Sequence, residues 1–483
     1  MREKIHETAC GAAIAVFSFV FSIQSNFNLF MNARYAGVDS SVFRTVAMYM
    51  RDGYMPYRDI FDHKGPLLYL YNRLGMLISD WKGVWVIEWL SLGVTFWFIY
   101  KTAGLICGRL LSLVTLLIVG AALFPYFDGG NYSEEYALPY IAASLFIFAD
   151  YFLRGRVGRF RLAVCGFCFG AVCLLRANMI AVWLVFCIAV LIKQVREKEY
   201  FHIITFALWF TAGVAVIAVP TVIWLAANGV FGDFVENYLL FNSAYVSDAD
   251  RASKINRYRA FSYFANNTFV LLSGCGMLYS CAKKKDLFHA SYLFCFLTSL
   301  LLICISGQQY SHYGMVLIPL MSYPIAALLG GKGRQTAGNS AFVLVAAYIL
   351  AVTALPQWMS GLDHAAECFW HRGNRVRGDE IGVISDWICE NTEKEDRITV
   401  YGNYNIFYVL SDRLSASRYS YQLPIGEVDK NILERYYAEL RNRNPKVIVV
   451  RPDELTEEME DFIAQFAYEQ VHESGEWLVF YLP

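Results

Sequence analysis

Acidic, basic and aromatic side chains gather just after the first long apolar stretch of the chain. Asp39 directly precedes an amphipathic stretch that suits a helix lying in a membrane interface. A carboxylate at the water–lipid boundary can act as a general base that takes a proton from an attacking hydroxyl group. The alternative is that Asp39 or Ser40 only caps this helix. Lys64, in the run 62–66, is either a cation that faces phosphate oxygens or a lysine that snorkels at the membrane edge.

Two adjacent glutamates, Glu134 and Glu135, lie in a short polar stretch between two apolar segments. Burying carboxylates in a membrane is costly, so we expect the pair to face a cavity. A compatible interpretation is that Ser133 caps a helix and Glu135 adds a favourable charge to its first turn. A carboxylate here could also hold a divalent cation, such as Mg²⁺ or Mn²⁺, through oxygen ligands, although the sequence contains no complete ligand set.

Two further polar residues interrupt apolar segments. Arg176 falls within the otherwise apolar stretch 172–185, where an arginine favours a specific partner, and an anion is the natural one. His312 belongs to the polar cluster 308–313. It either binds phosphate or hydrogen-bonds to neighbouring carbonyl groups.

The composition indicates where these residues lie. Of the 483 residues, 57% are hydrophobic and only 17% are charged, whereas a soluble domain averages about 25% charged residues. The chain is therefore predicted to be an integral membrane protein. Its net charge of −1 gives no general attraction to nucleic acid. The sequence contains no phosphate-binding loop, dinucleotide fingerprint, HExxH motif or GxSxG motif.

A membrane helix needs roughly twenty apolar residues, which predicts an all-α polytopic protein with about eleven crossings. We expect these helices at 11–31, 84–100, 109–127, 136–153, 160–175, 177–192, 201–227, 261–282, 287–307, 312–330 and 340–359. The basic residues between these segments fall on one side, which predicts a cytoplasmic N-terminus and an extracytoplasmic C-terminal region. They include Lys101, Arg109, the cluster Arg154/Arg156/Arg159/Arg161, Lys283–Lys285, and Lys332 with Arg334.

From residue 360 onward, charged residues become dense, and short apolar strands alternate with amphipathic helices. We expect a membrane domain over 1–359, with an interfacial loop at 32–83, and a small extracytoplasmic α/β domain over 360–483. Strands are predicted at 397–401, 446–450 and 477–481, and helices at 380–391 and 456–470. Cys368 and Cys389 are positioned to pair if this region is extracytoplasmic, although the sequence does not establish the bond.

The runs 38–43 and 56–69 resemble the first extracytoplasmic loop of the GT-C superfamily of membrane glycosyltransferases. The resemblance is to bacterial family-39-like members, which are relatives of protein O-mannosyltransferases and of the aminoarabinose transferase. The run 130–139 is similar to their second outer loop, and 401–419 is similar to the soluble tail of many of them.

The resemblance implies a GT-C fold and a transferase that moves a hexosyl or pentosyl unit from a polyprenyl-phosphate donor to a glycan or glycolipid acceptor of the cell envelope, with inversion of the anomeric centre. It implies that Asp39 is the catalytic carboxylate and that Lys64 faces the donor phosphate, and it places Glu134 or Glu135 at the second-loop acidic position. Ser40 stands where many relatives have glutamate, so a paired-carboxylate metal site is not implied. A transporter or flippase of lipid-linked saccharides is the alternative, and Glu88, inside a predicted crossing, favours it.

Overall fold

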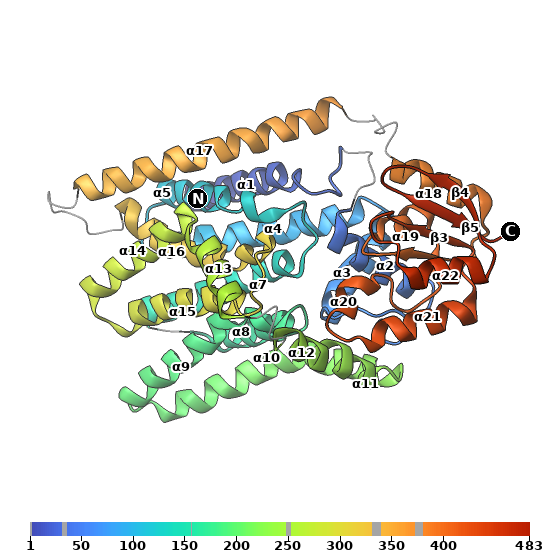
Figure 1. Cartoon of the computed structure of the whole chain (residues 1–483). Coiled ribbons are helices and arrows are strands. Elements are labelled where there is room, and N and C mark those ends of the chain that lie inside the picture. Colours follow the sequence, from blue (N-terminus) through green and yellow to red (C-terminus); the bar gives the residue numbers. More distant parts are fainter. Residues whose placement is uncertain (1, 31–35, 156, 248–252, 331–339, 372–379) are drawn as a thin grey trace. The chain divides into compact units, whose positions relative to one another are not determined.

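The computed structural model describes residues 2–30, 36–155, 157–247, 253–330, 340–371 and 380–483 (Figure 1). The chain divides into two compact units. The first contains Met1–Asn28, Trp85–Ile223 and Ala249–Trp370, and the second contains Leu29–Val84, Trp224–Asp248 and His371–Pro483. Three of the basic residues behind the predicted orientation, Arg156, Lys332 and Arg334, lie outside the described residues.

The first unit is helical in its described part. Its elements are α1 (Arg2–Ser22), most of α4 (Gly83–Ala103), α5 (Arg109–Ala121), α6 (Phe124–Phe127), α7 (Ser133–Arg154), α8 (Arg159–Cys173), η1 (Ala177–Met179), α9 (Ala181–Arg196), most of α10 (Tyr200–Ala227), α13 (Lys254–Ala265), α14 (Thr268–Lys284), α15 (Leu287–Ile303), η3 (Ser311–Leu317), α16 (Ile318–Gly330) and α17 (Ser340–Trp370).

Local sequence sets several of these helix ends. Gly155 adopts a left-handed conformation after α7, at a φ of 81°, which is a common way to end a helix. Asp286 begins α15 by accepting a hydrogen bond of 2.9 Å from the backbone N–H of His289. Asn267 separates α13 from α14 and caps α14 through its side chain. The single crossing predicted over 261–282 is therefore two helices.

Four segments of the described chain are long and apolar enough to cross a membrane: Gly83–Ala103, Ser133–Arg154, Tyr200–Ala227 and Ser311–Gly330. Few side chains of α10 are buried, and Leu208 and Val216 are each 65% exposed. Such an apolar surface is stable against lipid but not against water. The chain is a membrane protein. A helix lies at each predicted crossing, but the count of about eleven crossings stays a prediction.

Aromatic packing holds the long helix α17 alongside α1 (Figure 1). The Trp358 ring lies 6.4 Å from the Phe21 ring and 5.1 Å from the Phe124 ring, centroid to centroid. Its indole N–H donates a hydrogen bond of 2.8 Å to the carbonyl of Leu117. Burying this indole with its polar atom paired joins α1, α5 and α17 without a desolvation penalty.

The second unit combines helices with one sheet. Its elements are α2 (Val38–Arg51), α3 (Pro66–Ile78), α11 (Phe231–Phe234), the π-helix η2 (Val235–Leu240), α12 (Phe241–Ser247), α18 (Glu380–Asn391), β1 (Arg397–Tyr401), α19 (Ile406–Ser411), β2 (Leu414–Ser415), α20 (Gln422–Gly426), α21 (Asn431–Arg443), β3 (Val447–Val450), α22 (Glu457–Gln465), β4 (Glu469–Glu473) and β5 (Leu478–Tyr481).

The sheet has the strand order β2-β1-β3-β5-β4. Strands β1, β2 and β3 are parallel, whereas β5 runs antiparallel to β3 and to β4. The central strand β3 is buried along its whole length, which explains its continuous Val-Ile-Val-Val sequence. The three predicted strands are confirmed. The predicted helix 456–470 is wrong at its end, because α22 stops at Gln465 and β4 begins at Glu469.

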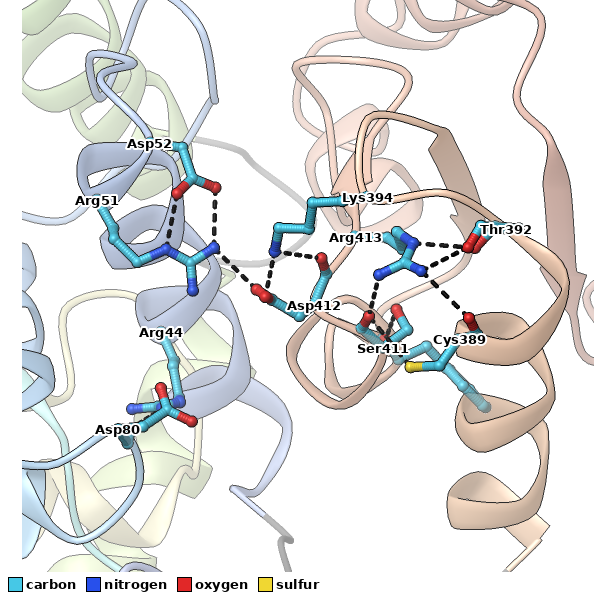
Figure 2. Close-up of polar contacts among 11 residues, drawn as sticks. Arg44, Arg51, Asp52, Asp80, Cys389, Thr392, Lys394, Ser411, Asp412 and Arg413 are labelled. Carbon is cyan, nitrogen blue, oxygen red and sulfur yellow. Dashed lines mark hydrogen bonds and ion pairs between the residues drawn. The ribbon is translucent and has the colours of Figure 1, made fainter.

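Helix α2 is tied to the C-terminal part of the second unit by ion pairs (Figure 2). Arg51 binds its neighbour Asp52 at 2.7 Å and reaches Asp412 at 2.8 Å, and Lys394 also binds Asp412. Arg44 is buried and pairs with Asp80 at 3.0 Å. The Arg51–Asp412 ion pair joins the last turn of α2 to the C-terminal part of the same unit.

Two element boundaries differ from expectation. Helix α1 runs from Arg2 to Ser22, whereas the predicted crossing was 11–31. Helix α17 continues to Trp370, across the predicted domain boundary at 360.

Both Cys368 and Cys389 are free thiols, and Cys389 contacts the carbonyl of Ser411 at 3.3 Å instead of pairing with Cys368.

Candidate functional site

Asp39 lies in the first turn of α2 and is partly exposed. The cap position itself is Gly37, at a φ of 81°, and it makes no side-chain capping hydrogen bond. Asp39 is therefore not the N-cap residue of α2, and neither is Ser40. Among the residues that the structure describes, no hydrogen bond or ion pair engages the Asp39 carboxylate, and it interacts electrostatically with the Tyr421 hydroxyl.

A fully buried carboxylate, Asp62, organises the loop that carries Lys64. It accepts hydrogen bonds from the Tyr421 hydroxyl at 2.6 Å, the Tyr69 hydroxyl at 2.8 Å and the His63 backbone N–H at 2.7 Å. Burial raises the pKa of Asp62, while the charge of Lys64 and these hydrogen bonds oppose the rise. Such a shift is typical of a carboxylate taken out of water and held by fixed donors.

His63 links this carboxylate to Lys64. The Lys64 ammonium lies 3.0 Å from His63 Nε2, and His63 Nδ1 lies 3.2 Å from the Tyr421 oxygen. A neutral imidazole with its proton on Nδ1 satisfies both contacts, because Nε2 then accepts from Lys64 and Nδ1 donates to Tyr421. Tyr421 in turn donates to Asp62, so one chain of hydrogen bonds runs from Asp62 to the Lys64 ammonium.

The backbone around Lys64 is fixed by its neighbours. The Tyr57 hydroxyl donates a hydrogen bond of 2.8 Å to the Lys64 carbonyl, and Asn242 donates one of 2.6 Å to the His63 carbonyl. The His63 ring also stacks on Tyr245, with 5.9 Å between centroids. These contacts fix the backbone at His63 and Lys64 and the ring of His63, which the Lys64 ammonium contacts.

In the first unit, Glu134 and Arg176 form a direct ion pair. Ser133 donates a hydrogen bond of 2.7 Å to the other oxygen of Glu134, and the Arg176 guanidinium lies 4.1 Å from the centre of the Tyr313 ring. The Glu134 side chain is 3% exposed and that of Arg176 is 17% exposed. The partner of Arg176 among the described residues is thus a protein carboxylate, and α7 begins with that carboxylate in its first turn.

His312 lies in a polar group next to this pair. Its ring stacks on Tyr132 at 4.1 Å between centroids, and its Nδ1 lies 4.0 Å from the Asp128 carboxylate. Ser311 also donates to that carboxylate, at 3.2 Å. The neighbouring His312 ring and the hydrogen bond from Ser311 lower the pKa of Asp128. His312 therefore has a side-chain acid as its neighbour, rather than only the carbonyl groups considered from the sequence.

Glu135 points to a different partner, Glu88 of α4. The two carboxyl groups lie next to each other, and both residues are completely buried. Glu135 also accepts a hydrogen bond of 2.7 Å from the Asn131 backbone N–H, and Glu88 accepts one of 2.5 Å from Ser25. The turn before α7 approaches closely enough that a Cβ on Gly130 would lie 2.4 Å from Glu88, so glycine is required there.

These contacts determine whether Glu134 and Glu135 can bind a metal ion. Glu134 is paired with Arg176, and Glu135 lies beside one further carboxyl group, that of Glu88. Within the described residues, no group of three or more His, Cys, Asp or Glu side chains gathers as a ligand set. The residues present do not fit the divalent cation considered from the sequence, and no step is assigned to one.

The structure thus collects the predicted residues into two groups, one in each unit. Asp39 and Lys64 belong to the second unit, with Asp62, His63 and Tyr421 as the residues that sequence reasoning missed. His63 and Asp62 lie next to Lys64 in the sequence, and this closeness could have marked them as candidate site residues. Tyr421 has no such signal, since 359 positions separate it from Asp62. Glu134, Arg176 and His312 belong to the first unit, with Tyr313 and Asp128 as their neighbours.

The arrangement of helices with a small C-terminal sheet is the GT-C fold of membrane transferases. ArnT from Cupriavidus metallidurans, solved with bound undecaprenyl phosphate, is 12% identical and has a TM-score of 0.63, with 98% of each chain covered. The archaeal oligosaccharyltransferase AglB from Archaeoglobus fulgidus, solved with an inhibitory peptide and a dolichol-phosphate, is 10% identical and has a TM-score of 0.53, covering 91% of this chain and 69% of AglB. At these low sequence identities, the structural similarity shows a shared fold only.

The sequence also matches one protein family. Residues 4–333 match the family described as "Putative competence-induced protein Ccs4 N-terminal domain", and the chain belongs to that family. No curated protein matches the chain.

Proposed function

We propose that the protein is an integral-membrane glycosyltransferase that moves a sugar from a polyprenyl-phosphate donor to a cell-envelope glycan or glycolipid on the extracytoplasmic side. The observation that carries this proposal is that a partly exposed carboxylate, Asp39, and a cation, Lys64, both adjoin the buried network around Tyr421 in the second unit. The fold shared with ArnT, whose structure contains undecaprenyl phosphate, supports a lipid-phosphate ligand.

In the proposed reaction, the acceptor oxygen attacks the anomeric carbon while the bond from that carbon to the phosphate oxygen breaks. Asp39 takes the proton of the acceptor hydroxyl, and the polyprenyl phosphate leaves with the electron pair of the broken bond. Direct displacement inverts the anomeric centre. Lys64 stabilises the charge that develops on the departing phosphate, an effect that is large where water is excluded.

Arg176 and His312 are proposed as further phosphate ligands. Arg176 has five N–H donors in a planar fork, so its ion pair with Glu134 leaves donors for a second anion. Glu134 then holds the guanidinium in position, and Tyr313 covers one of its faces. Glu135, which accepts a hydrogen bond from the Asn131 backbone and lies beside Glu88, is assigned to the positioning of the loop before α7.

The proposed orientation places the N-terminus in the cytoplasm and residues 360–483 outside. It rests on the basic residues that flank the apolar segments. Reporter fusions at residues 284 and 365 test it, and they should report opposite sides of the membrane. A cytoplasmic position for residue 365 would contradict the proposed reaction side.

The function is tested with the purified full chain in lipid and a panel of radiolabelled polyprenyl-phosphate sugars. We expect release of polyprenyl phosphate and labelling of the acceptor with one member of the panel. Asp39→Asn should reduce this turnover by roughly 10²–10⁴-fold, because the change keeps the shape of the side chain but removes the base.

Asp52→Asn, at the other end of α2, is the matched control and should retain turnover. Near-normal turnover by Asp39→Asn would remove Asp39 from the reaction. Movement of a labelled donor across the bilayer without cleavage would instead support the transporter alternative.

A further inference from the structure

The C-terminal sheet has a position at which its strand order reverses. Strand β1 continues through α19 to β2 on one side, and β3 continues through α22 to β4 on the other side. The two strands are parallel neighbours, and their last residues, Tyr401 and Val450, pair with each other. In open α/β sheets, ligands bind outside the carboxyl ends of the strands at such a switch point. The loops 402–405 and 451–454, which we call the switch-point loops, therefore lie where a ligand is expected.

The two switch-point loops contact each other closely. Gly402 has a φ of 123°, and a Cβ there would lie 2.4 Å from Glu454 Oε2 and 2.6 Å from the Tyr404 ring, so only glycine allows this approach. The Tyr404 hydroxyl donates a hydrogen bond of 2.9 Å to Glu454. The Tyr404 ring also lies 4.8 Å from the Trp477 ring, centroid to centroid and perpendicular to it. Both loops and the residue before β5 thus contribute to one group of side chains.

Three polar atoms in this region have no hydrogen-bond partner among the residues that the structure describes. They are Asn403 Oδ1, Glu454 Oε2 and Trp477 Nε1. Trp477 is only 3% exposed. Leaving buried donors and acceptors unpaired is costly, and protein interiors avoid it. Two acceptors and one donor held next to each other suit a ligand that carries both kinds of polar group.

The charge of the region distinguishes between classes of ligand. Asp453 binds Arg451 at 2.9 Å, and Glu457 and Glu458 follow in the first turn of α22. These carboxylates would repel a phosphate group. Across the described residues, no set of three or more His, Cys, Asp or Glu side chains gathers to hold a metal ion. A hydroxyl group is uncharged and both donates and accepts hydrogen bonds, which makes an uncharged compound with several hydroxyl groups the best match.

We propose that the switch-point loops bind a neutral hexopyranose unit of a glycan. Its hydroxyl groups replace the Tyr404 hydroxyl on Glu454 and reach Asn403 and Trp477. The Tyr404 ring, which is partly exposed, turns against the apolar face of the sugar. None of these residues takes part in the proposed reaction, and the proposal concerns binding alone, so it does not depend on that reaction.

The test is saturation-transfer NMR of the full chain in lipid nanodiscs, with the methyl glycosides of glucose, mannose, galactose and N-acetylglucosamine as probes. We expect at least one probe to bind. Glu454→Gln should weaken its binding by roughly ten- to a hundredfold, because the sugar loses hydrogen bonds to a charged acceptor. Tyr404→Phe should not weaken binding, because the hydroxyl that it removes competes with the sugar for Glu454.

Glu457→Gln is the matched control, because it removes an exposed carboxylate next to the switch-point loops and should leave binding unchanged. Equal affinities of Glu454→Gln and Glu457→Gln would overturn the proposal. Equal losses in Glu454→Gln and Tyr404→Phe would also overturn it, because the bond between these residues would then only support the fold. Binding of no probe in the panel would have the same consequence.

Two further measurements keep the outcome clear. Thermal unfolding shows whether each variant is folded, and Asn403→Ala, at a partly exposed loop position, replaces Glu454→Gln if that variant does not fold. Asn403→Ala should weaken binding, and an unchanged affinity would contradict the proposed contact. Sorbitol has several hydroxyl groups but no ring and should bind more weakly than the methyl glycosides. Equal binding of sorbitol would overturn the assignment to a sugar ring.

Discussion

The Tyr421 hydroxyl donates a hydrogen bond of 2.6 Å to Asp62, and the same hydroxyl lies 3.2 Å from His63 Nδ1. One tyrosine from the C-terminal part of the chain thereby controls which tautomer His63 adopts in the first polar loop. Because His63 Nε2 faces the Lys64 ammonium, the position of that cation depends on a residue far away in the sequence.

Tyr421→Phe should lower the turnover number by about ten- to a hundredfold, because a displaced Lys64 meets the phosphate less well. The Michaelis constant for the donor should change less than the turnover number. Tyr436→Phe is the matched control, since it also removes a buried hydroxyl hydrogen bond, to Thr399, in the same unit. Steady-state kinetics with varied donor check this, and equal effects of both changes would show that Tyr421 is merely structural.

The raised pKa of Asp62 predicts an acidic limb in the pH profile of turnover. Burial is the main cause of the rise, so Asp62 gains its proton above the ordinary aspartate range of about 3.9. Protonation on acidification weakens the hydrogen bonds that Asp62 accepts from Tyr421 and Tyr69, so turnover should fall. Asp62→Asn should give a lower plateau without this limb.

The effect of Asp62 on stability has the opposite sign. The folded chain binds this proton more tightly than the unfolded chain. Ionisation of Asp62 therefore lowers the free energy of unfolding as the pH rises from the ordinary pKa of an aspartate through the raised pKa of Asp62. Thermal unfolding across this range should show that Asp62→Asn removes the decrease, and an unchanged profile in the variant would assign it to another group.

The Glu134–Arg176 pair predicts non-additive stability effects. Glu134→Gln or Arg176→Gln alone leaves one buried charge without its partner and should cost about 3–5 kcal/mol. The double change should restore part of that loss, because no unpaired charge remains. Arg451→Gln, which removes an exposed ion pair with Asp453, should change little. Denaturation in detergent measures these differences, and additive losses would argue against a coupled pair.

From the sequence, Lys64 and Arg176 are expected to serve the same donor phosphate. Lys64→Met and Arg176→Gln should each lower the rate. The double variant should lose less than the sum of the two losses in activation free energy, because groups that act on one phosphate are coupled. Single-turnover rates at saturating donor give the required comparison, once folded protein has been confirmed. Additive losses would separate Arg176 from that phosphate.

Most elements were predictable because their signals are local. The stretch Glu380–Asn391 was predicted as a helix and is α18, and the apolar run at Val447–Val450 was predicted as a strand and is β3. The early start of α1 was not predictable from hydropathy, since Arg2 and Lys4 are charged yet helical. Hydropathy finds apolar segments, whereas a helix ends where its backbone groups find other partners.

The site was predictable only in part, for a physical reason. Asp39 and Lys64 lie near glycine and proline residues that mark a shaped loop, but the sequence does not say which partners they meet. Arg176 was expected to meet an anion, and in the structure its anion is Glu134. The packing of Tyr421 against Asp62 depends on tertiary structure that no local pattern encodes.

The outer strands of the C-terminal sheet determine how this part of the chain behaves at high concentration. At one edge, β4 carries Glu469 and Glu473 and contains a bulge between Gln470 and His472. At the other edge, β2 has only two residues, and both are buried. Charge, a bulge and short length each prevent a free strand edge from adding a strand of another molecule. The sheet is thereby protected against intermolecular β-aggregation, although its central strands are among the most apolar in the chain.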